Sequence, residues 1–325
     1  MTLHQFHRLG KIAISPPMAR QLSHDRVASD EGRNDRLRVR AIAGGEDWTV
    51  RNIICAAGPG DRPFEERHDG YSIAAVVEGT FTYKADSGSA LLHPGALLLG
   101  NDGKCFECNH EHGVGDRCIA FNFSRELFCE IAAAAGGTSR YAFSSPMLPA
   151  GKHSIPVLAL IEAIARDPDP AQVEEVAIRL VETVVFAFSD RALSPKLPSR
   201  RETRRIAEAL RHIEAHATEP LDLATLAALA NLSKYHFLRT FRRAVGMTPH
   251  QYVLAARMRR VASRLAGSSD TVTSIAFENG FGDLSTFNSR FRGIFGVSPT
   301  AYRSAFARRD PFPPCGGRSR AKRGG

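Results

Sequence analysis

Short apolar segments at helical spacing dominate the last third of the chain. The stretch "LDLATLAALANLSKYHFLRTFRR" (221–243) predicts two short helices separated by a tight turn. Asp222 and Ser233 are suitable N-cap residues, and Phe237 and Phe241 share one helix face at a spacing of four. Two short helices with this turn are typical of a helix-turn-helix unit.

The same pattern occurs a second time in "TVTSIAFENGFGDLSTFNSRFRG" (271–293). Phe287 and Phe291 take the places of the first phenylalanine pair, with Thr273 and Asp283 as the expected N-caps. Beyond each second helix the chain repeats a glycine, a Ser/Thr-Pro step and a tyrosine, in "GMTPHQY" and "GVSPTAY". The chain is therefore predicted to contain two helix-turn-helix units.

A longer helix is predicted between the two units. Pro249 opens "PHQYVLAARMRRVASRLAGS", which predicts a helix of about eighteen residues that ends at Gly267. Such a helix is a rod of roughly 25 Å. It suits two reading heads about one DNA turn apart, near the 34 Å repeat of the duplex, so each unit is expected to read one of two successive major-groove segments.

The second helix of each unit is expected to present its outer face to DNA, because the inner face carries the phenylalanine pair. This outer face combines donors, acceptors and apolar groups that suit base edges and phosphates. Arg239 suits a guanine, Asn288 an adenine, and Leu238 a thymine methyl group. The candidate DNA-binding residues are Lys234, Tyr235, Leu238, Arg239, Arg242, Arg243, Ser285, Asn288, Ser289 and Arg292.

Positive charges in this set are expected to hold the DNA backbone. Lys234, Arg243 and Arg292 suit phosphate contacts, which fix the register of the protein without reading sequence. The alternative for any one of these residues is a solvated helix surface.

The second unit, "IAFENGFGDLSTFNSRFRGIFGVSPTAYR" (275–303), resembles the signature of the AraC/XylS family of bacterial transcription regulators. The resemblance covers residues 200–305 and implies a seven-helix DNA-binding domain that recruits or blocks RNA polymerase at promoters. By position in the motif it implies base reading by Tyr235, Leu238, Arg239, Ser285 and Ser289. The family often has a longer side chain where this sequence has Ser289, so the second unit is expected mainly to grip the DNA backbone.

The N-terminal half has strand periodicity. Between residues 37 and 123, the segments "YSIAAVVEGTFTYKA", "GSALLHPGALLLGN" and "RCIAFNFS" predict an antiparallel barrel or sandwich. "HPGALLL" resembles the Pro-Gly step of a cupin barrel, the usual sensor domain of AraC relatives. A metal-binding cupin presents two histidines and a glutamate in its first motif, and only His68 and Glu78 occur here, so a cupin metal enzyme is not expected.

The stretch "CFECNHEHGVGDRC" (105–118) holds the most unusual chemistry of this half. As a strand it would place Cys108, His110 and His112 on one face, within reach of zinc or another soft metal ion. Cys105 or Cys118 would supply a fourth ligand. Two alternatives stay open: a redox-sensing thiol pair, and buried cysteines that pack or line a ligand pocket.

A helix is predicted after the β domain. In "EEVAIRLVETVVFAFSDRAL", Val176, Leu180, Val184 and Phe188 form an apolar stripe. The stripe is expected either to pack against the β domain or to pair two chains. The family resemblance favours pairing and therefore a homodimer.

Charge divides the chain near the Pro-containing stretch "SPKLPSRRETRR" (194–205). From residue 196 onward there are 23 Lys and Arg against 9 Asp and Glu, whereas residues 1–195 have 20 against 25. The basic C-terminal part suggests a polyanion, double-stranded DNA, as its partner. Without an apolar run long enough to span a bilayer, and without the apolar core of a signal peptide, a cytoplasmic, nucleoid-associated protein is expected.

Together these patterns predict an α+β protein of two domains: an antiparallel, cupin-like β-barrel with following helices, then an all-α domain with two helix-turn-helix units joined by a long helix. The predicted divisions are 1–36 (unassigned), 37–193 (sensor and dimerisation), 194–205 (linker), 206–307 (DNA binding) and 308–325 (basic tail).

The leading hypothesis is a sequence-specific transcription regulator controlled by an unknown small-molecule effector. A metal-dependent enzyme is the first rival, but the sequence has no complete metal triad, nucleophile elbow or phosphate loop. A second rival, a non-specific nucleic-acid packaging protein, would lack a large ratio of specific to non-specific affinity.

Overall fold

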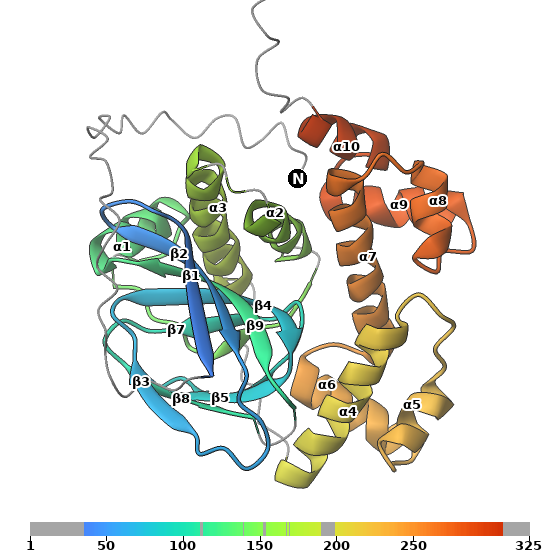
Figure 1. Cartoon of the computed structure of the whole chain (residues 1–325), viewed down its shortest axis with the longest axis horizontal. Coiled ribbons are helices and arrows are strands. Elements are labelled where there is room, and N and C mark those ends of the chain that lie inside the picture. The colour runs from blue at the N-terminus through green and yellow to red at the C-terminus, as the bar shows by residue number, and fades with distance from the viewer. Residues whose placement is uncertain are drawn as a thin grey trace, which may run out of the picture.

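Two domains of different class follow each other along the chain (Figure 1). The computed structural model describes residues 36–110, 113–138, 140–151, 154–166, 168, 170–189 and 199–307. The strands are β1 (Leu37–Gly44), β2 (Trp48–Cys55), β3 (Phe64–Arg67), β4 (Tyr71–Gly79), β5 (Phe81–Ala85), β6 (Gly88–Leu92), β7 (Leu97–Gly100), β8 (Cys105–Asn109), β9 (Asp116–Phe123) and β10 (Met147–Leu148).

The strands form two antiparallel sheets. One has six strands in the order β1-β2-β9-β4-β7-β10, and the other has four in the order β3-β8-β5-β6. Among the described residues no strand pairing joins the sheets, so the predicted antiparallel domain is a two-sheet sandwich and not one closed barrel. Side chains that include Val76, Phe81, Tyr83 and Leu92 form the core between the sheets.

Three helices cover the outer face of the six-stranded sheet: α1 (Arg125–Ala134), α2 (Ser154–Arg166) and α3 (Pro170–Ser189). This sheet is therefore buried on both faces, which explains continuous apolar strands such as "YSIAAVV". Leu180 and Val184 of α3 have no exposed surface, because α3 packs on α1, α2 and β1. The prediction that this stripe pairs two chains is wrong, since the stripe belongs to the chain's own core.

The C-terminal domain has the seven expected helices within residues 199–307. They are α4 (Arg200–His216), α5 (Leu223–Leu229), α6 (Lys234–Val245), α7 (Pro249–Gly267), α8 (Val272–Glu278), α9 (Leu284–Phe295) and α10 (Pro299–Ala307). No helix in the described part of the chain is long and apolar enough to cross a membrane.

Two boundaries differ from the sequence-based expectation. Residues 200–205 were expected in a linker, but they are helical because Ser199 and Glu202 form a capping box that starts α4. The N-cap of α8 is Thr271 and not Thr273, since the Thr271 hydroxyl accepts a hydrogen bond from the Ser274 amide. Residues 1–35, the rest of the predicted linker before residue 199, and the tail 308–325 lie outside the described residues.

Candidate nucleic-acid interface

Two helix-turn-helix units, α5–α6 and α8–α9, have matching cores. The rings of Phe237 and Phe241 lie 5.5 Å apart in the first unit, and those of Phe287 and Phe291 lie 5.8 Å apart in the second. All four side chains are fully buried. The predicted N-caps Asp222, Ser233 and Asp283 each accept a hydrogen bond from a backbone amide in the first turn. The repeat in the sequence therefore corresponds to a repeat in the fold.

The outer faces of α6 and α9 have the predicted orientation. On α6, Lys234, Arg239 and Arg242 are exposed and Leu238 is half-buried, while the Tyr235 side chain lies outside the described part of the structure. The four candidates on α9 are all exposed: Ser285, Asn288, Ser289 and Arg292. These side chains are free of the core packing that fixes the opposite faces. Their contacts with DNA stay a prediction.

Arg243 differs from the other candidates because it has a protein partner. Its Nη2 lies 2.8 Å from Oε1 of Glu202 on α4, and Nε2 of His236 lies 3.8 Å from the same oxygen. Hydrogen bonds from Ser199, followed by the Arg243 charge, lower the pKa of Glu202, so its charge persists at neutral pH. A phosphate contact by Arg243 would compete with this ion pair.

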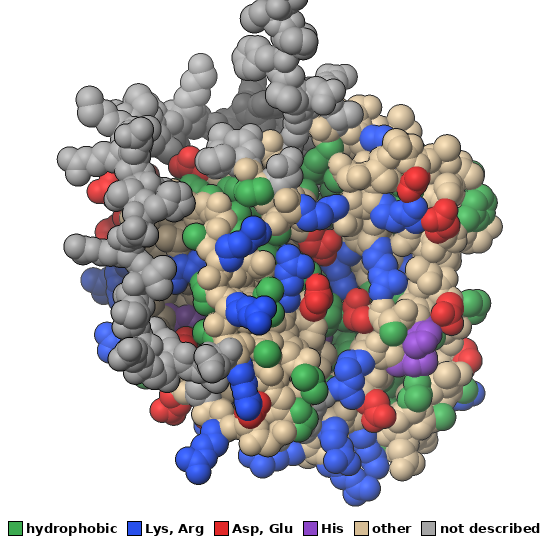
Figure 2. Space-filling model, viewed as in Figure 1, with side chains coloured by type: hydrophobic (Ala, Val, Ile, Leu, Met, Phe, Trp, Pro, Cys, Tyr) green, Lys and Arg blue, Asp and Glu red, His purple; other side chains and the backbone are tan. Residues whose placement is uncertain are grey.

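A cluster of arginines lies beside the first unit, at the N-terminal end of α4. Its members are Arg200, Arg201, Arg204 and Arg205. Figure 2 shows Lys and Arg side chains gathered over this end of α4, and α4 packs directly on α6. Positive charge is unfavourable at a helix N-terminus, where the helix dipole is itself positive. This cluster therefore extends the basic surface next to α6 at some cost to helix stability.

Arg257 of α7 ties the two units together. Its Nε donates to the carbonyl oxygen of Ala217 (2.6 Å) and its Nη2 to that of Glu219 (2.8 Å), both in the segment before α5. Its Nη1 donates to the carbonyl oxygen of Gly280, in the turn of the second unit, at 2.6 Å. With 19 residues, α7 is about 28 Å long. One guanidinium thus fixes the second unit relative to the first, a role that no local pattern in the sequence revealed.

The C-terminal domain also contacts the β domain, at the turn between β6 and β7. The Tyr252 hydroxyl lies 3.1 Å from the carbonyl oxygen of Pro94 and 2.7 Å from Oε1 of Glu214, and its proton is shared between these acceptors. Arg259 is only 6% exposed and donates to Oε1 of Glu214 at 2.9 Å. A Cβ atom at Gly95 would lie 2.3 Å from Nη1 of Arg259, so the turn packs directly on this guanidinium.

His93 in the same turn is fully buried between the domains. Its ring meets that of Tyr252 edge to face, with centroids 5.2 Å apart. Burial is the main reason that the pKa of His93 is lowered to about 4, so the ring is neutral at neutral pH. The sequence motif "HPGALLL" pointed to the sheet turn, but its contact with α7 spans more than 150 residues and gave no sequence signal.

The Cys/His stretch folds differently from the prediction. Strand β8 ends at Asn109, so the expected alternation does not extend to His112, which lies outside the described residues. Cys105 is exposed and Cys108 is buried, because residues three apart in a strand point to opposite faces. Among the described members of the predicted metal-ligand set, Cys105, Cys108, His110 and Cys118, the side chains are therefore not gathered at one point.

His110 instead meets two residues that the sequence reasoning missed, Cys55 and Asp116. One possible ligand atom from each of the three residues lies within 4.8 Å of the others. Nε2 of His110 is 2.5 Å from Oδ2 of Asp116, and the thiol of Cys118 donates to Oδ1 of Asp116 at 3.3 Å. Burial opposes a charge on His110, but hydrogen bonds to Asp116 and Cys55 outweigh it and raise the pKa of His110 to about 9.

The redox alternative finds no support in this geometry. The described cysteines 55, 105, 108, 118 and 129 are all free thiols. Burial raises the pKa of the Cys108 and Cys118 thiols well above the usual value, which disfavours the reactive thiolate.

The two cupin-motif candidates lie in different surroundings. His68 is buried, stacks on Phe106 with centroids 4.2 Å apart and hydrogen-bonds the Tyr83 hydroxyl at 2.9 Å. Glu78 is exposed and pairs with Arg117. They do not form a shared metal site of the cupin kind.

Comparison with known proteins assigns both domains. Residues 53–181 match the family model for an AraC-like ligand binding domain, and residues 226–305 match a helix-turn-helix domain. These two domains define a DNA-binding transcription regulator with a ligand-binding domain, which is not an enzyme. The chain belongs to the AraC family of transcription regulators.

Individual relatives cover different shares of the chain. The activator AarP from Providencia stuartii is 34% identical over 30% of this chain and 73% of its own length. The "probable transcriptional regulator LumQ" from Photobacterium leiognathi is 34% identical over 28% of this chain, and the chain covers only 37% of that protein. Among solved structures, the DNA-binding domain of AdpA in complex with a target DNA is 35% identical, with 32% of this chain and 96% of that chain covered and a TM-score of 0.31.

Proposed function

We propose that this regulator reads two successive major-groove segments of its operator, with α6 in one segment and α9 in the next. The observation that carries the proposal is the pair of matching units held by a single helix, α7, and by the three-way hydrogen bonding of Arg257. A helix of about 28 Å suits heads that bind near the 34 Å repeat of the duplex. Binding to chromosomal DNA would place the protein on the nucleoid, in the cytoplasm.

The two units would contribute differently to sequence recognition. On α6, Arg239 has the length and the fork of donors for bidentate contact with a guanine, and Leu238 next to it suits a thymine methyl group. On α9, the short side chains of Ser285 and Ser289 reach less far, and Asn288 is the longer amide that suits an adenine. We infer that α6 supplies most of the base discrimination and that α9 mainly positions the second unit on the DNA backbone.

Control by a small-molecule effector would pass through the contact between the domains. The β6–β7 turn touches α7 through Pro94 and Gly95, so a change of the β domain that moves this turn also acts on the first helix-turn-helix unit. RNA polymerase is the proposed second partner, because a regulator bound at a promoter acts on transcription by recruiting or blocking it.

We also propose that the protein is a homodimer, with an interface other than the buried stripe of α3. Light scattering at micromolar concentration tests this assembly. A monomer both with and without DNA would contradict it.

The DNA-reading proposal is tested by selection of genome fragments with the purified protein at about 150 mM salt, followed by footprinting of the enriched fragments. The expected result is two protected major-groove segments one helical turn apart. A single protected segment would contradict reading by both units. Enrichment of no fragment would support the rival proposal of binding without sequence recognition.

A pair of arginine variants separates base reading from phosphate binding. Arg239→Ala is expected to lower the affinity for the selected site by about 1–3 kcal/mol and to relax the base preference at one position. Arg242→Ala, on the same exposed face, is expected to weaken binding to all sequences equally and to reduce the salt slope by about 1. If Arg239→Ala, like Arg242→Ala, weakened binding to the selected site and to random DNA by the same factor, this result would argue against base reading by Arg239.

A further inference from the structure

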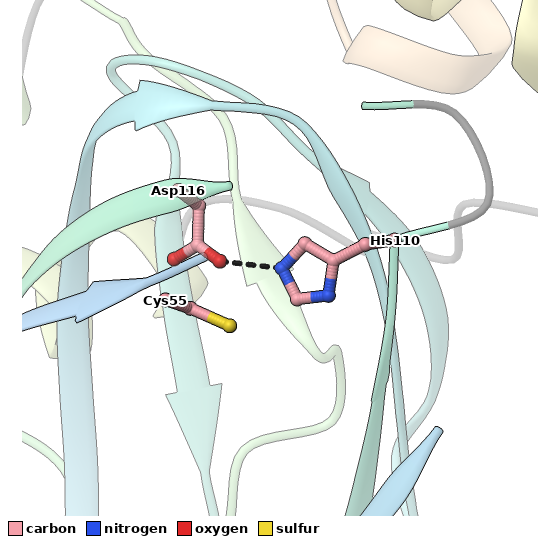
Figure 3. A group of neighbouring side chains, drawn as sticks. All are labelled: Cys55, His110 and Asp116. Atoms are coloured by element: carbon pink, nitrogen blue, oxygen red, sulfur yellow. Dashed lines mark hydrogen bonds and ion pairs between the residues drawn. The ribbon is translucent and has the colours of Figure 1, made fainter. Parts of the chain in front are cut away.

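Three side chains with metal-binding chemistry converge at one end of the β-sandwich: Cys55, His110 and Asp116 (Figure 3). Cys55 and His110 are buried, and each is 4% exposed. The side chain of Asp116 is 7% exposed. The cluster lies far along the chain from the helix-turn-helix units, and neither the DNA interface nor the domain contact uses it. A buried group of this kind needs its own explanation.

The strand register explains why these residues meet. Cys55 at the end of β2 and Asp116 at the start of β9 are direct partners in the antiparallel ladder, so their side chains leave the same face of the six-stranded sheet. Cys118, two residues after Asp116, points to that face as well. His110 directly follows β8 of the four-stranded sheet. The cluster therefore bridges the two sheets.

The orientation of the ring distinguishes between a metal site and a catalytic triad. In a Cys-His-Asp triad the thiol and the carboxylate face opposite ring nitrogens. Figure 3 shows the Cys55 thiol and the Asp116 carboxylate on the same side of the His110 ring. Phe81 stacks on this ring with centroids 5.5 Å apart and holds its plane. A thiol and a carboxylate on the same side of the ring can bind one cation together with the ring nitrogen. They are not placed to pass a proton from the thiol through the ring to the carboxylate.

The three side chains are of the types that bind zinc, and the distances between their ligand atoms are close to those of a zinc site. Zinc takes thiolate, imidazole and carboxylate ligands in tetrahedral geometry, with Zn–N and Zn–O bonds near 2.0–2.2 Å. Such bonds place a nitrogen and an oxygen ligand roughly 3.3 Å apart. Nε2 of His110 and Oδ2 of Asp116 are 2.5 Å apart, so binding a zinc ion requires these two atoms to move apart by about 0.8 Å. The Cys118 sulfur lies 3.3 Å from the other carboxylate oxygen, but it is not among the atoms that all lie within 4.8 Å of one another, so it would have to move toward the cluster to become a fourth ligand.

We propose that Cys55, His110 and Asp116 bind Zn²⁺ or another soft divalent ion, with the Cys118 thiolate as the fourth ligand. Such an ion would cross-link the two sheets at the end where β2 and β8 finish and β9 begins. This proposal is independent of DNA reading, because the ligands belong to the β domain alone. The proposed ligand set differs from the one expected from residues 105–118, because it includes Cys55 from the distant strand β2.

The first test uses the full-length protein without an affinity tag. After reduction and removal of metal by a chelator, the protein is dialysed against Zn²⁺, and the metal per chain is measured by mass spectrometry. One tightly bound ion per chain is expected. Replacement by Co²⁺ is expected to give thiolate-to-metal charge transfer in the near ultraviolet and intense visible bands, which are typical of tetrahedral cobalt. Absence of a stoichiometric ion, or a cobalt spectrum without the thiolate bands, would overturn the proposal.

Variants then identify the ligands. Cys55→Ser and His110→Gln are each expected to abolish stoichiometric binding. Cys105→Ser is the matched control, because this cysteine belongs to the same motif but is exposed on β8, and it is expected to retain the ion. Loss of the ion in Cys105→Ser, with retention in Cys55→Ser, would mean that the motif binds metal through its exposed thiols and that the proposed site is wrong. The cobalt spectrum of the unmodified protein keeps the test valid if a variant fails to fold.

Discussion

The hydroxyl of Tyr252, in the first turns of α7, lies 3.1 Å from the carbonyl oxygen of Pro94 in the β domain. Tyr252 is one of the residues that the two units repeat, and its counterpart Tyr302 packs on Phe291 in the second unit with centroids 5.5 Å apart. Both tyrosines stabilise their own unit, but the first also joins the two domains. The two units therefore keep a tyrosine at the same place in the repeat, but it is the tyrosine of the first unit that contacts the β domain.

Tyr252→Phe is expected to weaken the contact between the domains. Loss of the hydroxyl removes the hydrogen bond shared between Pro94 and Glu214, at a cost of about 1 kcal/mol in the free energy of unfolding. Hydrogen exchange should become faster at the backbone amides of the β6–β7 turn. Tyr302→Phe is the control and should leave exchange in that turn unchanged. Equal exchange in both variants would show that the hydroxyl does not restrain the turn.

Glu202→Gln is expected to increase DNA affinity. Glutamine keeps the N-terminal cap of α4, because either residue completes a capping box, but it removes the negative charge that pairs with Arg243. The freed guanidinium then becomes available to a phosphate, so the slope of log affinity against log salt should steepen by about 0.9. Titration of an operator at several salt concentrations measures the slope. Glu208→Gln, an exposed change on the same helix, should produce a smaller effect if the ion pair is the cause.

Acid is expected to destabilise the protein through His68 and His93. Burial is the main cause that lowers the pKa of each to about 4, whereas an unfolded histidine has a pKa of 6.5. The unfolded state therefore binds more protons in this range, and stability falls as the pH drops from 6.5 toward 4. Between pH 6.5 and 4.5 each histidine should cost about 2 kcal/mol.

Urea unfolding at these two pH values measures the effect. His93→Gln should reduce the difference between them by about the contribution of one histidine, roughly 2 kcal/mol. An unchanged difference would mean that His93 does not titrate as its burial requires. His110 has the opposite shift, so stability that depends on its proton is lost only as the pH rises from 6.5 through about 9, outside this interval.

Gly79→Ala is expected to destabilise the β domain beside the Cys55–His110–Asp116 cluster. Gly79 has φ +82°, and a Cβ atom there would lie 2.3 Å from the Gly115 carbonyl oxygen and 2.7 Å from the Cα of Asp116. Strain of this kind costs on the order of 1–3 kcal/mol. Gly60→Ala is the matched control, since Gly60 has φ +99° and open space around it. Thermal unfolding should show a clearly larger decrease in melting temperature for Gly79→Ala than for Gly60→Ala. Equal decreases would mean that the positive φ angle alone causes the destabilisation.

Local patterns predicted the DNA-binding domain well. The spacing of Phe237 and Phe241 places both rings on one helix face, and the N-caps Asp222 and Ser233 start helices through contacts only three residues away. Features of this kind are fixed by neighbours in the chain, so the sequence shows them directly. The duplicated pattern added a second, independent indication of the same fold.

Contacts between distant segments could not be predicted in the same way. Cys55 ends the mixed segment "WTVRNIIC", in which nothing marks it as a ligand, and it meets Asp116 only because β2 pairs with β9 in one particular register. Arg257 is one of several arginines on α7, and only the packed domain shows which carbonyl groups it joins. The apolar stripe of α3 was visible in the sequence, but periodicity does not say whether such a stripe packs on its own chain or on another. Packing on its own sheet was the outcome.

The continuous helix between the two units restricts how the regulator and its operator change over evolutionary time. One residue inserted into α7 would advance the second unit by about 1.5 Å and rotate it by about 100° relative to the first, because these are the steps of an α-helix. A flexible loop would absorb such an insertion, whereas α7 and the hydrogen bonds of Arg257 transmit it to both heads. Operators for this protein are therefore expected to vary in base identity at single positions while the number of base pairs between the two contacted segments stays constant.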